Sequence, residues 1–138
     1  MPDLERLSFS LERPLLERLE RLREEAGYGN RSELLRDMIR GRLVDRAWEL
    51  DGEAVGTITL VYDHHARRLN ERLTDLQHDH HEVILATTHV HLDHDLCAEV
   101  VLCRGPASRL QAIADGLRQH KGVLHAALSM SSTGRELR

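Results

Sequence analysis

Aromatic residues, cysteines and long apolar segments are all scarce in this chain of 138 residues. With one Phe, one Trp and two Tyr residues, any core must be built from aliphatic side chains, and an aromatic base-stacking platform is not expected. Two cysteines are too few for a disulfide framework, so reduced thiols are expected. The sequence has neither a run of 18 apolar residues nor a basic-then-apolar leader, which predicts a cytoplasmic protein with no membrane partner.

The net charge does not identify a class of binding partner. It is −4 at pH 7, so the charge of the whole chain does not indicate a nucleic-acid-binding protein. Any nucleic-acid interface must therefore arise from the local placement of side chains. The hydrophobic content of 41% is sufficient for an ordinary buried core, which argues against general disorder.

Residues 1–50 show the order strand, helix, helix. Apolar and polar residues alternate over residues 7–11, which predicts one strand with an apolar and a polar face. A first helix is expected from Pro14 until two glycines interrupt it, and a second from an Asn30 cap to about residue 50. Because a lone strand leaves both of its edges unpaired, we expect an intertwined dimer in which two copies of it pair.

The remainder of the chain has a different pattern. Residues 51–56 are expected to form a linker, 57–130 a folded domain and 131–138 a frayed tail. Strands are predicted at 57–62, 82–91, 97–103 and 123–130, with one helix ending near Gln77 and another opening at Pro106. The order βαββαβ is a ferredoxin-like split βαβ unit with a four-stranded sheet, so the fold class is α+β.

Histidine and cysteine concentrate in the segment HVHLDHDLC. His89 and His91 are two residues apart on a predicted strand, so their side chains project from one face. Cys97 joins that face if the following hairpin places it opposite either histidine, which requires an odd number of loop residues, and residues 92–96 supply five. One thiolate and several imidazoles can bind zinc in a tetrahedral site, or copper(II) or nickel(II) in a square-planar site.

A fourth ligand could come from the histidines that follow the first helix of this domain, His78, His80 or His81. His64 lies close enough in sequence to the domain's first strand to contact the metal ligands without binding the metal itself. The alternative is that His91 and His94 only lie in a polar turn and bind no metal. A lone histidine favours that interpretation, whereas the grouping of two histidines with a cysteine favours a metal site.

The N-terminal strand is a candidate DNA-reading element. If two copies pair antiparallel, the outward ribbon presents three polar side chains that can contact bases in the major groove, Arg6, Ser8 and Ser10. Backbone amides at the start of the second helix, around Asn30, Arg31 and Ser32, can hold a phosphate. The alternative is that the polar face of this strand is only exposed to solvent and contacts no DNA.

Four segments together make the chain resemble the nickel-responsive transcriptional regulators, the NikR-like family. They are RLSFSL, GYGNRSELLRDMIR, QHDHH and HVHLDHDLC, and the resemblance covers nearly the whole chain. It implies a ribbon-helix-helix (βαα) DNA-binding domain followed by an ACT-type metal-binding domain, assembled as a homotetramer, a dimer of dimers.

The resemblance also implies roles for individual residues. His89, His91 and Cys97 would bind nickel(II), one per subunit, with His78 supplied by a neighbouring subunit. A second cation site near the domain junction would involve Glu33 and Asp37. The chain departs from the family pattern where Asp79 interrupts the histidine run and where the reading strand carries Ser in place of the commoner Thr.

These features predict a nickel-sensing repressor that binds a double-stranded DNA operator and is not an enzyme. One alternative is a zinc enzyme that uses His89, His91 and Cys97 with an open water position. Another is an antitoxin-type ribbon-helix-helix protein, although its partner-binding segment would usually be disordered alone.

Overall fold

A computed structural model describes residues 3–138 of the chain. Two compact units are present: the chain up to Leu43 together with residues 136–138, and residues 44–135. The division falls inside the second helix, earlier than the boundary expected after residue 50. Each unit is described below by itself.

The first unit contains the two predicted helices. Helix α1 covers Arg13–Glu25, and α2 covers Arg31–Glu49 and continues into the second unit. The predicted cap of α2 is formed, because the Asn30 side chain accepts a hydrogen bond of 2.9 Å from the Glu33 amide. Leu19 on α1 and Leu34 on α2 are the buried apolar residues of these helices.

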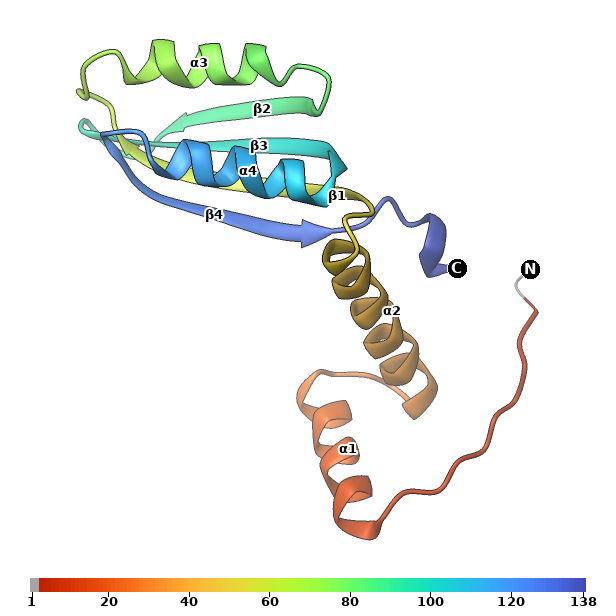
Figure 1. Ribbon diagram of the computed structural model, residues 1–138. Helices are drawn as coiled ribbons and strands as arrows, with labels where there is room; N and C mark the ends of the chain where they lie inside the picture. The colour runs from red at the N-terminus through yellow and green to blue at the C-terminus, as the bar shows by residue number, and fades with distance from the viewer. Residues whose placement is uncertain (1–2) are drawn as a thin grey trace. The chain divides into compact units, whose positions relative to one another are not determined.

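The strand predicted over residues 7–11 does not form in the single chain. Residues 3–12 are not hydrogen-bonded as a strand, and no other segment of residues 3–138 pairs with them (Figure 1). The physical reason is that a strand is defined by its partner, and the single chain provides none. Leu7 and Phe9, the apolar side chains of the alternating pattern, are 86% and 61% exposed.

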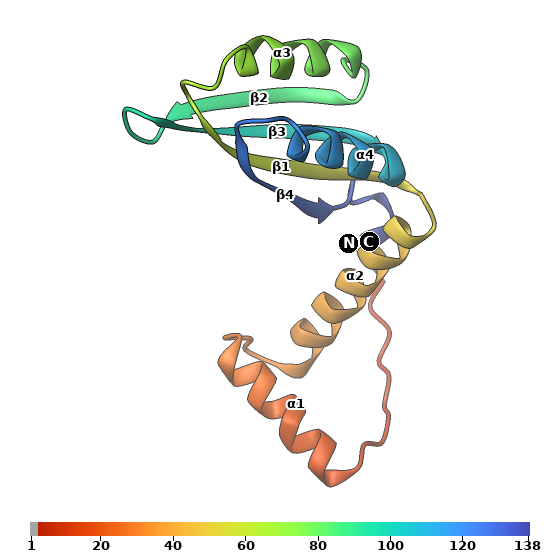
Figure 2. The same ribbon diagram turned by 60° about the vertical axis from the view of Figure 1, so that its left-hand side comes forward.

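The second unit has the predicted order βαββαβ. Its elements are β1 (Glu53–Asp63), α3 (Leu69–Asp79), β2 (Ile84–His91), β3 (Leu96–Pro106), α4 (Ala107–Arg118) and β4 (Val123–Ser131). The strands form one antiparallel sheet in the order β2-β3-β1-β4, visible in Figures 1 and 2. The α+β fold class is therefore confirmed.

Two segment predictions were wrong in detail. β1 begins at Glu53, so most of the expected linker 51–56 belongs to the strand, because Ala54 is buried and pairs with Gly105 of β3. The expected frayed tail contains a short 3-10 helix at Arg135–Leu137. Within the first unit, Arg40 donates a hydrogen bond of 3.0 Å to the Leu137 carbonyl.

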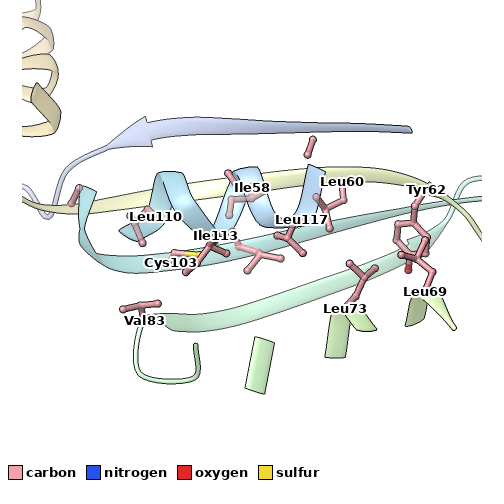
Figure 3. Packing of buried hydrophobic residues seen from close by; sticks show 14 of the residues in the cluster. Ile58, Leu60, Tyr62, Leu69, Leu73, Val83, Cys103, Leu110, Ile113 and Leu117 are labelled. Atoms are coloured by element: carbon pink, nitrogen blue, oxygen red, sulfur yellow. Dashed lines mark hydrogen bonds between the residues drawn. The ribbon is translucent and has the colours of Figure 1, made fainter. Parts of the chain in front are cut away.

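The core lies on one face of the sheet. Alternate residues of β1, namely Ile58, Leu60 and Tyr62, point toward α3 and α4 (Figure 3). Leu73 of α3 and leucines of α4 pack against them and are almost fully buried. The core is aliphatic apart from Tyr62 and two cysteines, as the composition predicts. No helix within residues 3–138 is long and apolar enough to cross a membrane.

The turn before β4 contains a position that requires glycine. Gly122 has φ of +97°, and a Cβ atom added there would lie 2.5 Å from the Ala66 Cβ. Gly122→Ala is expected to lower the free energy of unfolding by about 2 to 4 kcal/mol, through backbone strain and overpacking. Chemical denaturation measures this change.

Gly116→Ala is the matched control, because Gly116 lies in α4 and an added Cβ would make only an ordinary contact, 3.7 Å from Leu76. Removing glycine from a helix interior should leave stability equal or raise it by about 0.5 to 1 kcal/mol. Equal effects of the two substitutions would contradict this account of the turn.

Candidate metal centre

A thiol and two imidazoles meet at one end of the sheet. Cys97 of β3 is completely buried, and its Sγ lies 3.3 Å from His91 Nδ1 and 3.4 Å from His64 Nδ1. The two imidazole rings lie 5.0 Å apart between centroids. These three residues can direct one donor atom each toward a common ion.

Strand register produces this arrangement. In the antiparallel β2–β3 pair His91 is opposite Cys97, and in the β1–β3 pair Tyr62 is opposite Cys97. Residues that are opposite one another point to the same face of a sheet. Cys97, His91 and Tyr62 therefore share the face that α3 and α4 cover, as the five-residue loop predicted for His91 and Cys97.

His89 is the next side chain on the same face of β2. Its ring centroid lies 5.2 Å from that of His91, and its Nδ1 is 2.9 Å from the Tyr62 hydroxyl. Burial, with the Glu99 carboxylate and Cys97 nearby, raises the pKa of Tyr62 to about 12, so the hydroxyl keeps its proton at neutral pH. It can donate to Nδ1, which leaves Nε2 of His89 as the nitrogen free for a metal.

Burial raises the pKa of the Cys97 thiol above its ordinary value, and the Asp93 carboxylate raises it further. The metal-free thiol is therefore neutral near pH 7. A bound divalent cation reverses this preference, because it requires the thiolate as its ligand. The site holds a protonated thiol that a metal must deprotonate.

The histidines of the α3 C-terminus lie outside this cluster. His78 is an exposed residue in the last turn of α3 and belongs to no metal-ligating group within residues 3–138. His80 Nδ1 is 3.4 Å from the Arg109 guanidinium, and His81 Nδ1 is 3.1 Å from the His78 carbonyl. Asp79, the last residue of α3, is exposed.

Two further polar residues near the site were missed in the sequence. Glu99 is only 7% exposed and accepts a hydrogen bond of 2.8 Å from Gln77 of α3, while it pairs in register with His89. The sequence pattern could have identified Glu99, because this residue falls between Cys97 and Val101 on the apolar face of an alternating strand. Tyr62 is likewise on the inward face of β1 and was not singled out.

The donor set fits a borderline divalent metal. One buried thiol and the imidazoles of His89 and His91 lie on one face of the sheet, His64 reaches the thiol from the loop after β1, and the Tyr62 hydroxyl orients the ring of His89. Mixed nitrogen and sulfur donors are the ligands that nickel(II), copper(II) and zinc(II) take in proteins. His64, expected only to support the ligands, contacts Cys97 directly.

The predicted DNA-contacting residues occupy two surfaces of the first unit. Arg6, Ser8 and Ser10 are exposed on the extended N-terminal segment. At the start of α2 the Asn30 side chain is occupied by its capping hydrogen bond, and Arg31 forms an ion pair with Glu20 of α1. Ser32 lies in the first turn, where unpaired amides favour an anion.

The candidate second cation site has only two acidic groups. Glu33 and Asp37 lie one turn apart on α2 and line a hollow together with Arg36 and Arg40. The Tyr28 hydroxyl donates a hydrogen bond to Asp37, and this contact raises the pKa of Tyr28. The two guanidinium groups oppose cation binding in the isolated chain, so a cation held by Glu33 and Asp37 would require further ligands.

Two families match complementary parts of the chain. Residues 5–46 match the ribbon-helix-helix proteins of the copG family, and residues 55–131 match the NikR C-terminal nickel-binding domain. A putative nickel-responsive regulator from Solibacter usitatus is 48% identical over the full length of both chains. Another from Geobacter sulfurreducens is 50% identical over 96% of each chain.

A solved structure shows a similar fold over part of the chain. An uncharacterized protein from Thermotoga maritima is similar over 56% of this chain and 96% of its own, with a TM-score of 0.51 and 15% identity. That likeness concerns the fold alone. The family matches and the full-length relatives decide the assignment: the chain belongs to the nickel-responsive regulator family, with a ribbon-helix-helix domain and a NikR C-terminal domain.

Proposed function

We propose that the protein is a repressor that binds nickel(II), one per subunit, and gains operator affinity when it does so. The observation that carries this proposal is the cluster of Cys97 with His91 and His64, with His89 beside it. Its sulfur and nitrogen donors suit nickel, and the family to which the chain belongs supplies the choice of metal.

The ligands are proposed to come from two subunits. His89, His91 and Cys97 would bind from one chain, while exposed His78 would reach the site of a neighbour. His78 cannot be assigned to the site of its own chain from the groups within residues 3–138. A bound nickel ion would link the two chains by ligation, and the residues of both chains would then hold the interface in one arrangement.

Exposed apolar side chains support a dimer of the first unit. Leu7 and Phe9 belong to the unpaired N-terminal segment, and several apolar residues of the helices are also at least 40% exposed: Leu15, Leu22, Met38, Ile39 and Leu43. Large apolar side chains exposed in this number within one small unit are typical of a protein that forms an interface. Antiparallel pairing of two N-terminal segments would form the ribbon and cover these residues.

The open face of the sheet supports a second interface. Val90 of β2 is 49% exposed and Val100 of β3 is 39% exposed, because both point away from α3 and α4. Further chains packed on this face would complete a tetramer, a dimer of dimers. Closed assemblies of this symmetry are common among homo-oligomers.

The paired strands would read DNA. Arg6 can make a bidentate contact with guanine, Ser8 and Ser10 can contact several base edges, and the amides near Asn30, Arg31 and Ser32 can hold a phosphate. Fixing the interface between metal-binding domains would favour one spacing of the two DNA-binding dimers. Operator DNA must then tighten nickel binding by the same factor.

The alternatives lack support. The chain belongs to a family of regulators, and its relatives are not enzymes, so a zinc enzyme is not indicated. An antitoxin would need a partner-binding segment, whereas residues 57–130 lie in a folded domain with a continuous core. The ribbon-helix-helix match covers only the first part of the chain.

The raised pKa of Cys97 predicts a pH dependence of nickel affinity. Below that raised pKa each nickel ion must displace the thiol proton, so affinity should increase about tenfold per pH unit between pH 7.5 and 8.5. Calorimetry in buffers of different ionisation enthalpy measures the proton released.

Cys103 provides the matched control for this experiment. It is also a buried thiol on the inward face of β3, and burial raises its pKa to about 11. Cys103→Ala should retain the proton release and the thiolate absorption, whereas Cys97→Ala should lose both. Nickel affinity that is independent of pH over this interval would contradict the assignment of Cys97.

A second prediction concerns the base-reading strand. Arg6→Ala should remove about 1 to 3 kcal/mol of discrimination between operator and unrelated DNA while leaving the tetramer intact. Arg18→Ala, which removes the same charge from an exposed position of α1, should change affinity for both DNAs alike. Unchanged operator preference in the Arg6 variant would rule out its proposed role.

A further inference from the structure

Helix α2 carries a glycine in its interior that packing does not explain. Gly41 lies well inside Arg31–Glu49, where glycine stabilises a helix less than alanine does. Setting aside its chain neighbours and the backbone of the helix, no atom of residues 3–138 lies within 4 Å of a Cβ atom added at Gly41. Gly41 is also not among the residues with positive φ. An alanine would therefore fit at this position without strain.

Gly41 lies on the face of α2 that is buried toward both ends of the helix. Residues seven apart share one face of a helix, which places Leu34, Gly41 and Trp48 in one line. Leu34 is buried in the first unit, and Trp48 packs against the core of the second. Between them, residues 36–43 are all exposed. The middle of α2 therefore packs against neither core within residues 3–138.

The C-terminal end of α2 is fixed to the second unit. Trp48 Nε1 donates a hydrogen bond of 2.9 Å to the Ser131 carbonyl at the end of β4. The Asp51 side chain accepts one of 2.7 Å from the Ser108 amide in the first turn of α4. The segment 51–56, which was expected to be a linker, is therefore held by hydrogen bonds where it leaves the helix.

The N-terminal half of α2 is fixed to the first unit. The Asn30 side chain caps the helix, and the Tyr28 hydroxyl donates a hydrogen bond to Asp37. The Arg40 side chain donates to the Leu137 carbonyl, and both of these residues belong to the first unit. This last contact therefore does not cross the division between the two units.

We propose that α2 is hinged at Gly41, so that its two halves bend relative to each other in the metal-free protein. Glycine has the greatest backbone freedom of all residues, and helix kinks occur at such positions. The division of the chain into two units after Leu43 falls within the next turn. Ile39 and Leu43 point to the opposite side of the helix from Gly41, so the dimer proposed above would leave this side uncovered.

A hinge at this point would be a device for regulation. Bending of α2 would let the two DNA-binding units of an assembly take several spacings without disturbing the metal-binding domain. Nickel must then act against this freedom when it favours one spacing, so a single residue would set part of the cost of activation. This regulatory consequence rests on the proposed function, whereas the bending itself does not.

Amide hydrogen exchange of the full-length, metal-free protein, resolved to single residues, tests the hinge. The amides of residues 43–45, which bond to the carbonyls of residues 39–41, should exchange faster than those of residues 47–49. Gly41→Ala should slow exchange at residues 43–45 about fivefold, the factor that corresponds to the helix preference of alanine over glycine. Gly116→Ala, the same change in α4, should leave these amides unchanged.

The regulatory consequence is tested with nickel-loaded protein and an operator selected from random DNA. When the two half-sites are moved one base pair apart, the wild type should lose about fivefold less affinity than Gly41→Ala does. Gly116→Ala should behave as the wild type.

Equal exchange at residues 43–45 in the wild type and in Gly41→Ala would overturn the hinge. Exchange in the wild type that is no faster there than at residues 47–49 would overturn it as well. Equal tolerance of the altered spacing in both proteins would overturn the regulatory use of the hinge. Failure of nickel to promote operator binding in the wild type would count only against the proposed function.

Discussion

The register of β2 and β1 on β3 is the constraint on which the metal cluster depends. His91 and Tyr62 are each paired opposite Cys97. This register places the two candidate ligands, His91 and Cys97, and the Tyr62 hydroxyl on one face of the sheet. A shift of one residue in either pair would turn the side chains to the open face. The buried alternation of β1 and β3 fixes the register between these two strands, so the aliphatic core also positions Tyr62 and Cys97.

Much of this arrangement follows from local pattern, and the rest depends on contacts distant in sequence. The period-2 spacing of His89 and His91 and the five-residue loop predicted the shared face of β2 and Cys97. His64 could not be placed among them, because its loop meets Cys97 only after β1 and β3 pair. Glu53 was assigned to a linker because strand pairing, not local hydropathy, extends β1 to that residue.

Two features of the single chain have the same physical meaning. Leu7 and Phe9 are exposed on a segment without a partner strand, and His78 lies outside the metal-ligating groups described. The proposed assembly accounts for both features, because another copy of the chain would pair with the N-terminal segment and would accept His78 as a ligand. In the proposed assembly one contact builds the DNA-reading ribbon, and the other links nickel to quaternary structure.

The central claim, a nickel site shared between chains, is tested most directly by mixing His78→Ala subunits with Cys97→Ala subunits. Each variant lacks a different ligand, so neither alone should show the square-planar thiolate absorption. After subunit exchange verified by mass spectrometry, sites that combine Cys97 of one chain with His78 of the other should restore that absorption and operator binding together. Verified exchange without any recovery of the absorption would contradict a shared site.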